Sequence, residues 1–74
     1  MNNDRRKELR RAHAILETLQ ADIEALRDAE QDAYDNLPES IQNSERGEKI
    51  QEAIDALDSA VTNIETAKDD LEGI

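Results

Sequence analysis

Apolar side chains in the first half of the chain recur at alternating steps of three and four residues, which is the spacing of a heptad repeat. These positions are Leu9, Ala12, Leu16, Leu19, Ile23, Leu26, Ala33 and Leu37, with Glu30 as a polar exception. The second half repeats the spacing at Ile50, Ile54, Leu57, Val61, Ile64 and Leu71, with Lys68 as its exception. No segment alternates apolar and polar residues at the period of a strand, so the pattern predicts an all-α protein.

The two apolar stripes match each other if the chain folds back on itself near residue 40. Leu19 then faces Val61 and Leu26 faces Ile54, and each such layer joins an a position to a d position, as an antiparallel pair requires. We therefore predict a single domain, an antiparallel two-helix hairpin that resembles a coiled coil. Its parts are a helix over about 4–36, a turn over about 37–43 and a helix over about 44–72.

The register also assigns places to the residues that interrupt the pattern. Lys68 is expected opposite the small Ala12, with Glu8 one helical turn away. Gly47 is expected opposite Ala33, where the absence of a side chain would let the two helices approach closely.

The segment between the stripes contains the only proline and one of the two glycines of the chain. Pro38 disfavours helical angles at the preceding residue and is expected to end the first helix. Ser40, Asn43 and Ser44 are candidates to cap the second helix. A structural turn explains these residues, but an ordered tip that docks on a partner remains an alternative. The candidate contact residues at this tip are Tyr34, Leu37, Ile41 and Arg46.

A chain of 74 residues without cysteine buries a small core and has no disulfide to stabilise it. The second helix carries three further apolar residues, Ala53, Ala60 and Ala67, in the g positions beside its seam. Ile15 widens the apolar face of the first helix in the same way. A face wider than one seam indicates a second contact. We expect a homodimer in the form of a four-helix bundle, with a partner protein as the alternative.

The net charge of −10 is unevenly distributed along the chain. Residues 1–14 contain five basic and two acidic side chains, whereas residues 15–74 contain four basic and 17 acidic ones. We expect no direct nucleic-acid binding, because most of the surface would repel phosphates. The basic N-terminal segment is expected to be a solvated helix start, with a tether to nucleic acid or an anionic membrane as the alternative. No apolar run suggests a signal peptide or a membrane span, so we expect a cytoplasmic protein.

No arrangement of residues in the sequence suggests catalysis, a cofactor or a metal. The single histidine, His13, falls at an e position and is expected to be solvated. No Glu-x-x-His motif, calcium loop or glycine-rich phosphate loop is present. We therefore do not expect an enzyme.

Acidic side chains follow the outer face of the second helix at Glu45, Glu48, Glu52, Asp55 and Asp69. Such a row keeps a small protein soluble. It can also imitate the phosphates of DNA and attract a basic protein. Helical spacing alone produces rows of this kind, so both interpretations stay open.

The segment "LPESIQNSERGEKIQEAIDALDSAVTNIETA" and the preceding "AEQDAYDNLP" resemble a group of short, acidic, helical proteins of bacterial and prophage genomes. The resemblance spans about residues 29–67 and rests on the Leu-Pro-Glu-Ser and Ser-Glu-Arg-Gly-Glu sequences around the turn. The group has no assigned activity, so the resemblance implies a fold and a phage-type setting.

These observations lead to one functional expectation and two alternatives. We expect a non-enzymatic protein–protein interaction module, a phage-type inhibitor or regulator that binds a bacterial host protein. A structural coiled-coil subunit of a larger assembly and an acidic DNA mimic are the alternatives.

Overall fold

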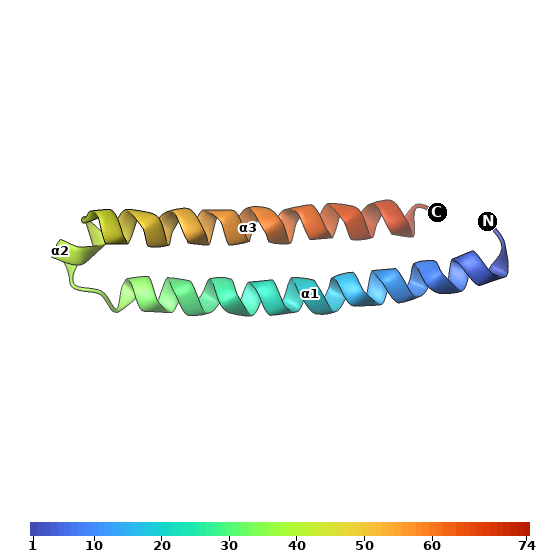
Figure 1. Ribbon diagram of the computed structural model, residues 1–74, viewed down its shortest axis with the longest axis horizontal. Coiled ribbons are helices and arrows are strands. Elements are labelled where there is room, and N and C mark those ends of the chain that lie inside the picture. The colour runs from blue at the N-terminus through green and yellow to red at the C-terminus, as the bar shows by residue number, and fades with distance from the viewer.

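The computed structural model describes residues 1–74 as two long antiparallel helices joined by a short third one (Figure 1). The helices are α1 (Asn3–Asp35), α2 (Glu39–Gln42) and α3 (Glu45–Glu72). Helices α1 and α3 pack along their lengths, α2 lies at the closed end, and both termini lie at the open end. The molecule is a rod of 58 × 14 × 12 Å. The predicted all-α helical hairpin is confirmed, whereas α2 was not anticipated.

Local side-chain chemistry sets the ends of α1. Asn2 caps its start, with the side-chain Oδ1 accepting a hydrogen bond of 2.8 Å from the backbone N–H of Arg5. At the other end the backbone N–H of Asn36 bonds to the carbonyl of Asp32. The helix thus ends before Pro38, whose extended backbone starts α2.

The junction between α2 and α3 depends on Ser44 and Gly47. Ser44 takes the extended backbone of an N-cap, but its hydroxyl donates to the carbonyl of Ile41 and makes no cap to α3. Gly47, the third residue of α3, is buried beneath α2. A Cβ there would lie 2.1 Å from the carbonyl oxygen of Gln42. The glycine is therefore required by the turn, and the predicted pairing with Ala33 is wrong, because Ala33 is exposed.

The α3 side of the hairpin core matches the heptad pattern. Ile54 and Val61 are only 4% and 7% exposed, and Gly47 continues the same column. The remaining seam positions of α3 are half-buried, namely Ile50, Leu57, Ile64, Lys68 and Leu71.

Helix α1 presents a different face from the predicted one. The a positions of α1 are half-buried, as expected. Its e positions are half-buried as well, namely His13, Gln20, Arg27 and Tyr34. The d positions face solvent, with Leu19 45% and Leu26 58% exposed. The predicted burial of these two leucines is wrong. The reason is that polar e-position side chains find partners on α3, which turns the d column away from it.

Candidate interaction surfaces

One flank of the hairpin is held by polar contacts between the e positions of both helices. The Arg27 guanidinium of α1 donates to Asp58 of α3 at 3.2 Å, and also reaches Asp28 at 3.3 Å. The hydrogen bond to Asp58 is the main cause that raises the pKa of Arg27; partial burial opposes it, and Asp28 adds to it. This contact fixes the rotation of α1 against α3, because both partners lie on one side of the seam.

Lys68 belongs to the same polar flank. Its ammonium donates to the Gln20 side chain at 3.0 Å and lies 3.9 Å from the Glu17 carboxylate. The expected surroundings, Ala12 and Glu8, are wrong. The aliphatic part of the Lys68 side chain instead crosses the seam toward α1, and its ammonium group lies at the edge of the seam near solvent.

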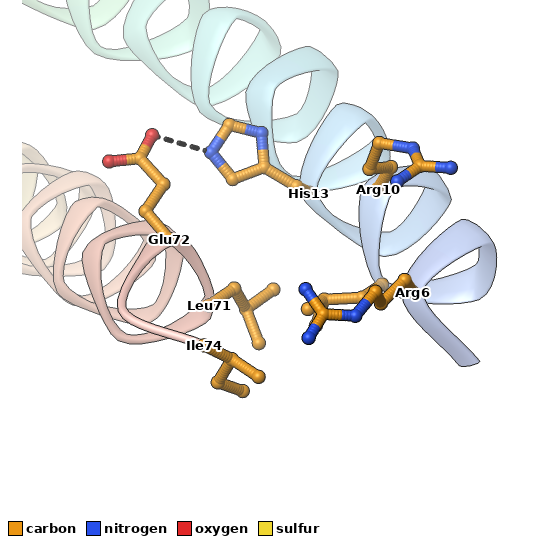
Figure 2. A pocket seen from close by; sticks show the side chains of 7 residues that line it. Arg6, Arg10, His13, Leu71, Glu72 and Ile74 are labelled. Carbon is orange, nitrogen blue, oxygen red and sulfur yellow. Dashed lines mark hydrogen bonds and ion pairs between the residues drawn. The ribbon is translucent and has the colours of Figure 1, made fainter. Parts of the chain in front are cut away.

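His13 joins the two helices at the open end. Its Nε2 lies 2.8 Å from the Glu72 carboxylate of α3 (Figure 2). Its Nδ1 lies 3.7 Å from the Glu17 carboxylate of its own helix. The side chain is 22% exposed, which agrees with a half-exposed e position, but the expectation of a lone solvated histidine is wrong, because both ring nitrogens face carboxylates. A shallow hollow beside this contact is lined by Arg6, Leu9, Arg10, Leu71 and Ile74. The basic segment of α1 thus meets the acidic end of α3 here.

The candidate residues at the closed end are divided between two places. Tyr34, Leu37 and Ile41 are half-buried around the turn, where the Gln42 amide donates to the Tyr34 carbonyl at 2.9 Å. Arg46 is exposed and lies apart from them. It lines a second hollow together with Glu30, Glu45, Lys49, Ile50 and Ala53. The structure therefore gives the first three residues a packing role at the turn and leaves Arg46 on the surface.

The alanine column of α3 lies at the edge of the hairpin. Ala60 and Ala67 are half-buried and Ala53 is exposed. Part of the wide apolar face of α3 is therefore already covered within the hairpin.

A second apolar stripe, on α1, was missed as a continuous feature. We call it the α1 stripe, and its members recur at steps of three and four: Ala12, Ile15, Leu19, Asp22, Leu26, Ala29 and Ala33. All are exposed, including Ile15 at 48%. A shallow groove runs beside Ile15 and Leu19. The sequence contains a signal for this stripe: the apolar residues Ile15 and Ala29 occupy g positions, which lie next to the d positions on the helix surface.

The two flanks of the hairpin therefore differ in character. Successive residues of an α-helix are rotated by about 100°, so the d and g positions lie on the side of the seam opposite the e positions. The e flank carries the polar contacts of Arg27, Lys68 and His13. The other flank carries the α1 stripe and the alanine column of α3. We call it the apolar flank.

No protein-family model, curated protein or solved structure matches this chain. No helix has both the length and the apolar content needed to cross a membrane. No group of three or more His, Cys, Asp or Glu side chains is arranged to hold a metal ion.

Proposed function

We propose that the chain is a non-enzymatic protein–protein interaction module that acts through its apolar flank. In this proposal the hairpin associates through this flank into a homodimeric four-helix bundle, and the bundle binds the host protein, so a change that disrupts the flank also loses the host protein. It serves as a phage-type inhibitor or regulator of a bacterial host protein.

The observation that carries the proposal is the exposure of the α1 stripe. Ile15, Leu19 and Leu26 are each about half exposed, although each is of a type that is usually buried. They lie on one face of one helix, at the spacing that packs against another helix. Contiguous exposed apolar surface on a small protein indicates a contact surface.

The charge of the molecule favours a protein as the partner. A net charge of −10 repels both nucleic acid and anionic lipid headgroups. The stripe itself contains only one charged residue, Asp22. A surface with an apolar centre and charged edges is suited to binding a helix of another protein chain.

Two alternative functions are also compatible with features of this surface. A structural subunit of a larger assembly would also use the apolar flank. A DNA mimic would instead use the acidic outer face of α3, where Glu48, Glu52, Asp55 and Asp69 are exposed and have no ion-pair partner within the chain.

Affinity capture from bacterial lysate distinguishes these functions. Tagged wild-type protein is compared with a Leu19→Glu/Leu26→Glu variant at about 50 mM and 200 mM salt. Both leucines are exposed, so the variant hairpin should keep its helical circular dichroism. An Ala21→Glu variant is the matched control, because Ala21 is exposed on α1 away from the stripe.

The regulator function predicts one stoichiometric partner that is retained at the higher salt by the wild type and the control, and lost by the double variant. Capture of only salt-sensitive basic proteins, equally by all three, supports the DNA mimic. Capture of nothing beyond the chain itself supports a self-assembling structural unit and refutes the regulator function.

A further inference from the structure

We propose that a second copy of this chain covers the apolar flank in an antiparallel arrangement, with α1 on α1, α3 on α3, and one two-fold axis perpendicular to the rod. This inference rests on the proposed function of that flank as a protein-contact surface. It adds the occupant, the orientation and the contacting residues.

The α1 stripe is self-complementary when two copies run in opposite directions. Ile15 of one copy then faces Leu26 of the other, and Ala12 faces Ala29 in the same register. Each pair joins a d position to a g position, as an antiparallel seam requires. The groove beside Ile15 and Leu19 is the place where the opposing Leu26 would pack. The centre of this register lies between Gln20 and Ala21.

The alanine column of α3 is self-complementary in the same way. Ala60 faces its own copy, and Ala53 faces Ala67 of the second copy. Small side chains in such a column allow close approach of two helices. The centre of this register is Ala60.

The hairpin places these two centres at one level. Leu9 and Leu71 line one hollow, and Glu30 and Ile50 line another, so these pairs mark matching levels of α1 and α3. Midway between the two levels, Gln20 of α1 lies near the level of Ala60 of α3. The longer side chains of the Arg27–Asp58 and His13–Glu72 contacts place the midpoint up to five residues further along α3, because side chains lean toward the N-terminus of their own helix. The two centres therefore lie within about one helical turn of each other, close enough for one two-fold axis to serve both seams.

The charges beside both seams are complementary in this orientation. Next to the α1 stripe, in the c positions, the exposed Arg11 of one copy faces the exposed Asp32 of the other. Next to the alanine column, also in c positions, Lys49 faces Asp70. Each pair occurs twice because of the two-fold symmetry. A two-fold axis parallel to the rod would instead place α1 on α3 and Arg11 beside Asp70, so the cross-links and the charge reversal below distinguish the two arrangements.

The contacts that Arg11 and Lys49 make within their own helices do not prevent them from pairing with Asp32 and Asp70 of the second copy. Arg11 contacts Glu8 at 3.2 Å and Lys49 contacts Glu45 at 3.6 Å, and all four side chains are highly exposed. Exposed ion pairs within one helix contribute little to stability, so the cations remain free to pair across the interface.

Single-cysteine cross-linking tests the proposed axis, because the chain has no cysteine of its own. A disulfide needs Cα atoms within about 4.4–6.8 Å. Under mild oxidation the Ala60→Cys variant should form a covalent dimer with itself. Ala53→Cys alone and Ala67→Cys alone should not, but a mixture of these two variants should cross-link. Sedimentation equilibrium of the wild type, in parallel, should give the mass of a dimer.

Other outcomes overturn the inference. A wild-type dimer in which Ala60→Cys does not cross-link with itself indicates a two-fold axis parallel to the rod, with α1 on α3. A monomer in sedimentation shows that no second copy covers the flank. If this monomer still captures a host protein that the Leu19→Glu/Leu26→Glu variant loses, the proposed regulator function survives, while the proposed homodimer and this inference both fail.

A charge exchange provides the second test. Arg11→Asp should weaken dimerisation about 5- to 30-fold, because two attractive contacts become repulsive. Adding Asp32→Arg in the same chain should restore it. Arg10→Asp, which makes the same charge change at a b position away from the stripe, is the control. Equal weakening by Arg10→Asp, or no recovery in the double variant, refutes the Arg11–Asp32 contact.

Discussion

Gly47 lies directly beneath the backbone carbonyl of Gln42, and a Cβ at this glycine would come within 2.1 Å of that oxygen. The contact joins the first turn of α3 to the end of α2. It fixes the path of the chain through the closed end, because a backbone atom has no freedom to move aside as a flexible side chain would.

Gly47→Ala should therefore destabilise the protein, although alanine is the better helix former by about 1 kcal/mol. Forcing a methyl group against packed backbone costs about 1–3 kcal/mol, and here it must displace α2. Urea unfolding measures the change. Gly73→Ala is the matched control, since a Cβ there meets only ordinary contacts of 3.4 Å or more. Equal stability of the two variants would contradict the close approach of α2.

Ile54→Ala and Leu26→Ala should differ in their dependence on protein concentration. Ile54 is 4% exposed within the hairpin, so its truncation should cost about 2–5 kcal/mol at every concentration. Leu26 is exposed in the hairpin, so its truncation should matter only where the dimer is populated. Denaturant midpoints at several protein concentrations test this. A concentration-independent loss for Leu26→Ala would show that this leucine belongs to the hairpin core.

Arg27 and Asp58 should show a favourable coupling in a double-mutant cycle. Arg27→Ala and Asp58→Ala each remove one partner of the contact across the seam, so the double variant should be more stable than the sum of the single changes predicts. The coupling should shrink as salt is added, because both side chains are partly exposed. Additive single changes would mean that the pair does not orient α1.

Asp22→Leu should strengthen the proposed dimer. Asp22 is the only charged member of the α1 stripe and faces Leu19 of the second copy in the antiparallel register. Replacing two carboxylates by apolar groups should lower the dimer dissociation constant about tenfold or more, as sedimentation measures. Asp28→Leu, on the outer face of α1, is the control. A dimer unaffected by Asp22→Leu would place the seam elsewhere.

The heptad spacing was sufficient to predict two antiparallel helices and the α3 face that contains Ile54 and Val61. It was not sufficient to predict the rotation of α1. The a/d pattern treats every apolar residue as a core residue, but Gln20 and Arg27 make contacts with α3 that place them in the seam instead of Leu19 and Leu26. Side-chain partners across the seam decide the rotation, and heptad spacing alone does not contain them.

The closed end shows a related limit of sequence reasoning. The sequence predicts that Gly47 is a position of close approach between helices, with Ala33 as its neighbour. The true neighbour is α2, a single turn of four residues whose presence no periodicity could indicate. The α1 stripe was only partly recognised for a similar reason, since its d-position members had already been assigned to the hairpin seam.

The polar contacts along the e flank also bear on the order in which the hairpin folds. The Arg27–Asp58 contact joins residues 31 apart in the sequence, whereas the His13–Glu72 contact joins residues 59 apart. Because closing a longer loop costs more entropy, pairing should begin beside α2 and proceed toward the termini. The open end is then the last part to form and the first to fray. Amide hydrogens near Leu71 should exchange faster than those near Ile54, and the histidine contact limits how far this fraying extends.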